Sequence, residues 1–447
     1  MAADAPAAEI LTPPGPVPRA VPISHIVAVS AGNALDFYDF ITYALFAIYI
    51  GRAFFPSHSA SASLLASLAT FGVGFLARPI GGIVLGSVGD RFGRRPAMLL
   101  TFGLMGLGML GVAATPPAKA IGWIAPALLI LFRLIQGFAL GGQVGPSTAY
   151  LLEAAPEKER AFYTSLQAIS QQCAVVAGSA IGLGITLLMP AAAVQAYGWR
   201  IVFLLGVAVV PYGLWVLAKL PETLEAKPPA GPSHPATAAI PATRVRDHKR
   251  VLAASFIFLV GGTMSTYATN YLTTWAMDSL HMDANVAFGR TVLTTLIGMG
   301  AIWIGARLAD RFGRAPLMIW PLVAALVLSP IVFLFITGHP SILVLFAGTS
   351  LLAAIGPLCN GASYATMVDC LPPQIRSAAF GTVYALAIGI FGGATQFVIK
   401  WLIHITHRPM MLGWYLTFAI AVSLVGVFLF PNIGWPRLRR AAPAAVP

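Results

Sequence analysis

Long apolar segments follow one another along almost the whole chain, and they limit how it can fold more than any other feature. A helix needs roughly 20 apolar residues to cross the hydrocarbon core of a bilayer. Twelve segments meet or approach that length, at residues 25–50, 62–88, 97–115, 122–151, 162–189, 200–220, 251–277, 286–308, 316–337, 341–368, 378–403 and 411–431. Strands of an outer-membrane barrel would be about half as long and would alternate polar with apolar residues. The sequence therefore predicts an all-α polytopic membrane protein with twelve transmembrane helices.

Charged side chains are too scarce for the chain to fold with water as its main solvent. Only 9% of the 447 residues are charged, whereas an ordinary soluble domain has roughly 25%. The three cysteines have neither paired nor metal-ligand spacing, so we expect no disulfide and no metal site. The sequence also lacks a nucleophile or nucleotide-binding motif, and we expect neither enzymatic activity nor a cofactor.

The net charge of +12 reflects where the basic residues lie rather than a nucleic-acid partner. If both termini are cytoplasmic, nineteen of the 27 lysines and arginines fall in inside loops and tails. The outside loops and adjoining helix ends hold six: Arg52, Lys119, Arg200, Arg290, Lys400 and Arg408. This asymmetry follows the positive-inside rule. It predicts a multi-pass protein of a bacterial inner membrane with both termini in the cytoplasm.

The chain divides at one long polar stretch near its midpoint. Residues 221–250 are rich in proline, alanine, lysine and arginine, which is typical of a linker. We expect a disordered cytoplasmic tail at 1–24, a six-helix bundle at 25–220, a cytoplasmic linker at 221–250, a second bundle at 251–431 and a tail at 432–447.

Two pairs of matching motifs indicate that the halves are repeats. GSVGDRFGRRP at 86–96 follows the second apolar segment, and ARLADRFGRAP at 306–316 follows the eighth, with their aspartates 220 residues apart. An acid, a proline and an arginine follow the fourth segment at positions 153, 156 and 160, and they recur after the tenth at 369, 372 and 376. Because both pairs keep their order and nearly the same offset, they predict two parallel six-helix repeats.

The charged residues of these loops are candidates for a gate. Carboxylates beside arginines at helix ends can form charge-assisted contacts between the two halves, and we hypothesise that they hold the cytoplasmic face closed in an outward-open state. The alternative is that the loops are basic only because they set orientation in the membrane. The candidate gating residues are Asp90, Arg91, Arg94, Glu153, Arg160, Asp310, Arg311, Arg314, Asp369 and Arg376.

The motifs resemble those of a known transporter family. The DRFGR loops resemble the signature of the major facilitator superfamily. GNALDFYDF at 32–40, ARPIGGIVLG at 77–86 and RLIQGFALGG at 133–142 are similar to its metabolite:proton symporters. FYTSLQAISQQCAVV at 162–176 and YGWRIVFLLG at 197–206 resemble most the citrate and tricarballylate symporters. The resemblance covers residues 24–431 and implies the major facilitator fold. Family relatives usually carry Glu at the position of Asp36 and an acid at that of Gln143.

Ionisable residues inside the apolar segments are functional candidates, because burying charge in a membrane is costly. The first segment carries Asn33, Asp36 and Asp39 at three-residue steps, near one helix face. Arg78 and Arg133 lie inside the second and fourth segments. The two arginines are candidates for binding substrate carboxylates, and the two acids for carrying the coupled proton. Alternatively, these acids and arginines neutralise one another as structural ion pairs.

Uncharged polar residues suggest a central cavity between the repeats, although such residues more often hold membrane helices together. With Asn33 and the two arginines, the substrate-binding candidates are Gln136, Gln167, Gln171, Tyr267, Asn270, Tyr271, Asn360 and Tyr364.

These observations predict proton-coupled symport of an organic acid anion, such as a citrate-like tri- or dicarboxylate, by alternating access. The expected partners are that anion, the proton and the lipid bilayer, with no nucleic acid, and we expect a monomer. The alternatives are another cargo, such as a zwitterionic osmolyte, an aromatic acid or an exported drug, and a receptor that does not transport.

Overall fold

The computed structural model describes residues 23–92, 94–141, 155–207, 248–371 and 373–430, together with Thr148, Leu151, Leu152 and Pro211. At 23–25, 28–29, 36, 86, 89–92, 94–98, 157 and 373–378 it describes the backbone alone. Both predicted tails lie almost entirely outside the described residues. So does the predicted linker, except that helix α14 begins at Lys249, inside its last residues.

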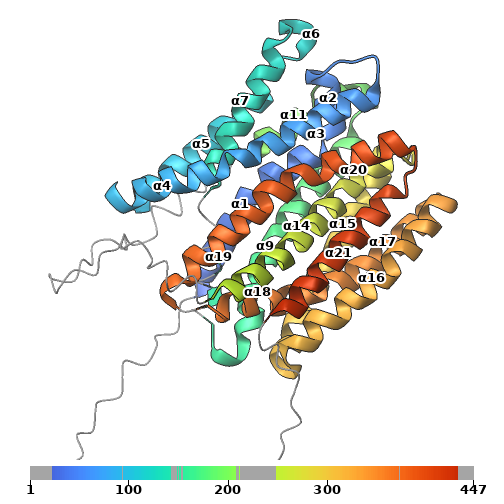
Figure 1. The fold of residues 1–447 in the computed structure, drawn as a ribbon. Helices are drawn as coiled ribbons and strands as arrows, with labels where there is room; N and C mark the ends of the chain where they lie inside the picture. Colours follow the sequence, from blue (N-terminus) through green and yellow to red (C-terminus); the bar gives the residue numbers. More distant parts are fainter. Residues whose placement is uncertain are drawn as a thin grey trace, which may run out of the picture.

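The first half of the chain forms helices joined by short turns (Figure 1). These are α1 (Ile23–Leu45), α2 (Ala47–Phe54), α3 (Ala60–Leu76), α4 (Arg78–Phe92), α5 (Arg94–Ala114), α6 (Ala118–Ile121), α7 (Ile124–Ala139), η1 (Glu157–Glu159), α9 (Arg160–Leu188), α10 (Ala191–Ala193), η2 (Val194–Gly198) and α11 (Trp199–Gly206).

The second half is also helical. It comprises α14 (Lys249–Asp278), α15 (Ala284–Phe312), α16 (Arg314–Gly338), α17 (Ile342–Ile355), η3 (Gly356–Cys359), α18 (Asn360–Asp369), α19 (Pro373–Ala387), η4 (Ile388–Gly392), α20 (Gly393–Thr406) and α21 (Met411–Leu429). The described part of the chain contains no strand.

The predicted fold class is confirmed, because each of the twelve apolar segments contains helix. Eight described helical stretches are long and apolar enough to cross a membrane, and the pair α1–α2, bent by 65°, makes a ninth. The other three segments correspond to the shorter apolar helices Leu99–Ala114, Ile124–Ala139 and Ala191–Gly206. Several spans are interrupted; α3 gives way to α4 next to Pro79, which cannot donate a helical hydrogen bond.

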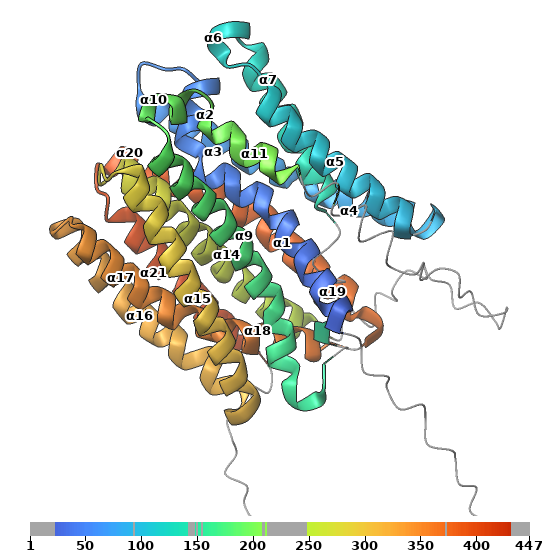
Figure 2. The same cartoon turned by 180° about the vertical axis from the view of Figure 1, so that it is seen from behind.

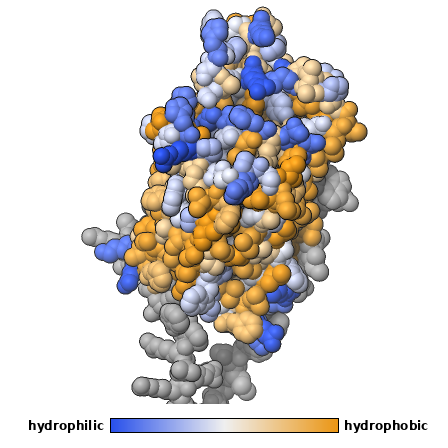
Figure 3. Space-filling model, turned by 90° about the vertical axis from the view of Figure 1, so that its right-hand side faces the viewer, coloured by the Kyte–Doolittle hydropathy of each residue, from blue (hydrophilic) through white to orange (hydrophobic). Residues whose placement is uncertain are grey.

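The outer surface is apolar where a bilayer would surround it. Figure 3 shows a broad apolar band around the middle of the molecule, with hydrophilic residues gathered above it. Large side chains such as Ile83, Leu334 and Phe418 are exposed on different helices. A surface of this kind is unfavourable in water and suited to lipid.

Several helix pairs join the halves, among them α9 with α18 and α1 with α14. Helix α9 of the first half packs against α15 of the second, and the two lie side by side in Figure 2. Helix α3 packs against α20, where a Cβ atom on Gly72 would lie only 2.9 Å from the carbonyl oxygen of Gly393. We call the end of the bundle that carries the α4–α5 and α15–α16 junctions the DRFGR end. There Gly313 has φ of +96°, which favours glycine.

Glycines also bring α3 and α7 together inside the first half. A Cβ atom on Gly137 would lie 1.7 Å from the carbonyl oxygen of Gly74, so the two backbones touch without intervening side chains. This approach is of the small-residue kind common between membrane helices. It places Arg133, one turn before Gly137, against α1 and α3.

We predict that Gly137→Ala destabilises the protein by about 1–3 kcal/mol, because the added methyl group forces α3 and α7 apart. Thermal unfolding of the purified protein in detergent measures the effect. The matched control is Gly184→Ala on α9, where an added Cβ meets no atom within 4 Å and alanine should be neutral or stabilising. Equal unfolding temperatures for the two variants would contradict this account of the packing.

Candidate functional site

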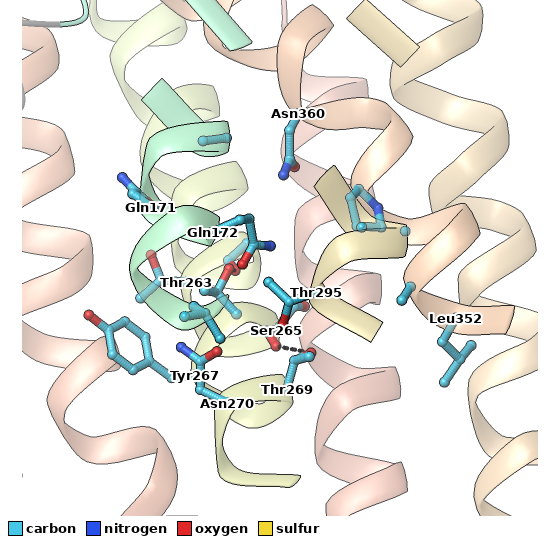
Figure 4. Close-up of a pocket in the computed structure, with 18 of the residues that line it drawn as sticks. Gln171, Gln172, Thr263, Ser265, Tyr267, Thr269, Asn270, Thr295, Leu352 and Asn360 are labelled. Carbon is cyan, nitrogen blue, oxygen red and sulfur yellow. Dashed lines mark hydrogen bonds between the residues drawn. The ribbon is translucent and has the colours of Figure 1, made fainter. Parts of the chain in front are cut away.

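A cavity of about 220 Å³ lies at the interface of the two halves. Helices α1 and α9 line it from the first half, and most of its wall comes from the second half, including α14, α15 and α18. Figure 4 shows Gln171 and Gln172 of α9 beside polar side chains of α14 and α15. The cavity therefore offers hydrogen-bonding groups from both halves.

Five of the predicted substrate-binding residues line this cavity. They are Gln171, Tyr267, Asn270, Asn360 and Tyr364. Gln171 Nε2 donates to the Tyr384 hydroxyl at 3.2 Å, and this bond crosses from α9 in one half to α19 in the other.

Asn33 and Gln167 do not line the cavity but bond α1 to α9. Gln167 Nε2 donates to Asn33 Oδ1 at 2.8 Å, and Asn33 Nδ2 donates to Ser170 Oγ at 2.7 Å. Both side chains therefore hold α1 and α9 together. Uncharged polar residues in membrane helices more often have this role than bind a ligand. Tyr271, also predicted, is fully buried away from the cavity wall.

Asp39, Arg133 and Gln136 form a closed hydrogen-bonded group with no exposed surface. Arg133 Nη1 donates to Asp39 Oδ2 at 3.0 Å and to Gln136 Oε1 at 2.8 Å, while Gln136 Nε2 donates to Asp39 Oδ1 at 2.8 Å. The Arg133 guanidinium also lies 4.3 Å from the ring centre of Phe40 and 4.5 Å from that of Tyr43. Arg133 is therefore paired with an acid in this state, and neither Arg133 nor Gln136 lines the cavity.

Arg78 lies behind the cavity wall, at the break between α3 and α4. Its guanidinium is held between the rings of Phe40 and Phe75, at 4.2 and 4.1 Å, in cation–π contacts. It interacts with the hydroxyl of Tyr267, which lines the cavity. None of the ion pairs between described residues involves Arg78.

Six of the predicted site residues lie outside the described side chains. They are Asp36, Asp90, Arg91, Arg94, Glu153 and Arg376.

At the DRFGR end, Asp310 of the second half caps a helix of the first. Its carboxylate accepts hydrogen bonds from the backbone N–H groups of Ala161 and Phe162, each at 2.9 Å. These N–H groups lie in the first turn of α9 and have no acceptor within their own helix. A negative charge is favourable at that position, so the cap holds α9 to α15.

Asp369 bridges the halves at the same end. It accepts from Arg160 at 2.8 Å and from Arg314 at 3.1 Å, and these arginines come from different halves. A more exposed pair, Arg307 with Glu159 at 3.1 Å, crosses the same boundary. Arg311 instead lies over the ring of its neighbour Phe312.

The structure also adds residues that were not predicted as part of a site. Arg290 and Lys400 were counted above with the outside loops and adjoining helix ends, but both side chains are buried inside the bundle, at 1% and 4% exposure. Lys400 Nζ forms an ion pair with Asp278 at 2.6 Å, whereas Arg290 lines the cavity. Arg290 lies within the predicted apolar segment 286–308. That position could have marked it as a candidate buried charge, but it was grouped with the basic residues of the outside loops.

The chain is similar in sequence to known transporters and similar in fold to a solved structure. The family model described as Major Facilitator Superfamily matches residues 29–394. The citrate-proton symporter of Klebsiella pneumoniae is 33% identical over 403 residues, which is 90% of each chain. The alpha-ketoglutarate permease of Escherichia coli K12 is 31% identical, covering 90% of this chain and 93% of that protein. The proline/betaine transporter of the same organism is 29% identical, covering 94% of this chain and 85% of that protein.

Among solved structures, a D-xylose-proton symporter matches with a TM-score of 0.73 at 18% identity, over 92% of this chain and 98% of that one.

We predict that Asp310→Ala loosens the contact between the halves and exposes the cavity. Cys359 lines the cavity and is buried, so its alkylation by N-ethylmaleimide reports opening. The assay uses detergent-purified protein with the exposed Cys173 and Cys370 replaced by serine. We expect alkylation to be about tenfold faster in Asp310→Ala, because the variant loses acceptors for two hydrogen bonds worth roughly 1 kcal/mol or more in total.

The control is Glu159→Gln, which breaks the more exposed pair with Arg307 and should change the rate little. Equal alkylation rates in wild type and Asp310→Ala, with both proteins monodisperse, would show that the Asp310 cap does not hold this end closed.

Proposed function

The chain belongs to the Major Facilitator Superfamily, and on this premise we propose that it is a symporter that moves an organic acid anion together with protons. It is a multi-pass membrane transporter of the helical major facilitator fold, and not an enzyme. The cargo and the residues that bind it are our proposal.

The main support for an anionic cargo is that buried cations outnumber buried acids among the described side chains. Among the described side chains, Asp39 pairs with Arg133 and Asp278 with Lys400, so each pair is neutral. Within this described set, Arg78 and Arg290 are buried without an ion-pair partner. Burying a cation is costly unless an anion accompanies it, and a guanidinium suits a carboxylate. A cargo with two or more carboxylates, as in the citrate-proton symporter to which the chain is similar, would offset both charges.

Among the described side chains, Asp39 is our candidate for the residue that binds the coupled proton. It is fully buried, and both Arg133 and Arg78 lie within electrostatic range of it. A substrate anion beside these arginines would compete for the same positive charge and so favour a protonated Asp39. Substrate binding and proton binding would then assist one another, as symport requires. Asp36 stays a second candidate, on the sequence alone.

The contacts at the DRFGR end support alternating access by movement of one half against the other. Asp310 and Asp369 link the halves at that end, which we propose to be cytoplasmic on the distribution of basic residues. Breaking these links would let the cavity open to the cytoplasm.

A zwitterionic cargo is the second candidate, and the similarity to a proline/betaine transporter favours it. A single carboxylate on the cargo would engage one arginine and leave the other unpaired.

We predict that proteoliposomes of the wild-type protein accumulate labelled citrate or a related di- or tricarboxylate when the outside is acidified. A protonophore should abolish this accumulation, and liposomes without protein give the background. The same screen includes 2-oxoglutarate, proline and betaine. Proton-driven uptake of proline or betaine alone would replace the anionic cargo with the zwitterionic one.

We predict that Asp39→Asn abolishes uptake driven by the pH gradient but retains exchange of internal for external substrate. Asparagine has nearly the size of aspartate and keeps one oxygen that accepts from Arg133, but it carries no titratable proton, so translocation continues without coupling. The measurement compares gradient-driven uptake with exchange in the same liposomes. Gradient-driven uptake at the wild-type rate would exclude Asp39 as the proton site.

A further inference from the structure

Arg290 is a buried cation that faces the cavity from the second half. It lies in the second turn of α15, six residues or about 9 Å along the axis from the first residue of that helix. Its side chain lines the cavity and is 1% exposed.

The contacts of Arg290 leave most of its hydrogen-bonding capacity unused. Nη2 donates to Thr291 Oγ1 at 2.6 Å and to Thr273 Oγ1 at 3.3 Å, whereas Nε and Nη1 have no partner among the described residues. Hydroxyl groups accept a hydrogen bond but do not neutralise a charge. A guanidinium with unmet donors in a low-dielectric site is costly to bury, and a planar carboxylate offers two acceptors matched to its fork.

The two threonines orient this guanidinium. Their hydroxyl oxygens lie 2.5 Å apart in a hydrogen bond that joins α14 to α15, and Thr291 also donates to the Ala287 carbonyl oxygen at 3.0 Å. The hydrogen bond between the two threonines does not involve Arg290. The arginine is therefore not needed to join these two hydroxyl groups.

Polar side chains from both halves surround the same space. Thr294 and Thr295 follow Arg290 on α15, and Asn270 faces the cavity from α14. Gln172 of α9 reaches across the interface to α15, where its Nε2 would lie 3.9 Å from a Cβ on Gly298. Figure 4 shows Gln172, Asn270 and Thr295 around one opening. A ligand held at Arg290 would thus be within a cavity that both halves form.

We propose that Arg290 binds a carboxylate of the transported anion directly, with Thr273 and Thr291 as positioning residues. This inference rests on the proposed function in one respect, namely that the cargo is an organic anion. It identifies the residue that holds the anion in the second half. Both arginines have unpartnered N–H groups, but the charge of Arg133 is paired with Asp39, whereas Arg290 has no ion-pair partner among the described side chains.

The test compares Arg290→Met and Arg290→Lys with wild type in detergent, by thermal unfolding with and without citrate. Without ligand, Arg290→Met should be at least as stable as wild type, because it removes an unpaired buried charge at similar volume. Its affinity for citrate should fall about 10- to 100-fold. Lysine keeps the charge but loses the bidentate geometry, so Arg290→Lys should lie between the two. 2-Oxoglutarate, betaine and xylose serve as comparison ligands.

The matched control is Lys400→Met, which removes a buried cation that does have a partner. It should lower the ligand-free unfolding temperature, because Asp278 loses its counter-charge, and it should leave citrate affinity unchanged in the folded fraction. An Arg290→Met protein that is destabilised without ligand, yet binds citrate like wild type, would assign Arg290 a structural role and overturn the proposal.

The outcomes separate this inference from the proposed function. If citrate binding depends on Arg290 but no pH gradient drives uptake, the carboxylate site stands and proton coupling fails. If citrate binds equally to wild type and Arg290→Met, the anionic cargo stands and the Arg290 site fails. If no carboxylate stabilises the wild type while betaine does, both the anionic cargo and the Arg290 site are rejected.

Discussion

The cost of placing charge in an apolar medium governs this structure more than any single contact. The sequence predicts that most basic residues lie in loops, tails and the helix ends beside them, as the positive-inside rule expects. Inside the bundle, described charges occur as close pairs, Asp39 with Arg133 and Asp278 with Lys400, or against aromatic rings, as for Arg78. A paired buried charge is stable only while its partner remains. Arg290 has no such partner among the described side chains, so the same constraint makes it the position where a ligand would contribute most.

Close backbone contact supplies the rigid frame that such charges need. Gly74 and Gly137 bring α3 and α7 together, and Gly72 and Gly393 bring α3 to α20 across the interface. Helix α3 therefore packs on its own half and on the other half at once. The Asp310 cap on α9 adds a polar contact between the halves at the DRFGR end. Close packing within each half and separable polar contacts between the halves are what movement of two rigid halves requires.

Much of the fold, but less of the site, could be predicted from the sequence. Segment length and repeated DRFGR motifs predicted the helices and their duplication, because bilayer thickness fixes helix length. The sequence marked Asp39 and Arg133 as charges inside apolar segments, although it did not distinguish an ion pair from a ligand site. The sequence could not show that Asp310 would bond backbone N–H groups rather than arginines, since that depends on how α15 meets α9. Arg290 was not proposed as a site residue because counting charges by loop does not show whether a side chain near a helix end points into the bundle.

The arrangement of these groups also implies how substrate and proton sites would communicate. The cavity is lined mainly by the second half, while Asp39 lies in the first. Tyr267 connects them, because it lines the cavity, interacts with Arg78 and packs on Phe71 and Phe75 of α3. Arg78 in turn lies within electrostatic range of Asp39. Under the proposed function, a charge that enters the cavity would act on Asp39 across the interface through Tyr267 and Arg78. Since that interface is what must rearrange in alternating access, occupancy, protonation and movement would be linked at one place.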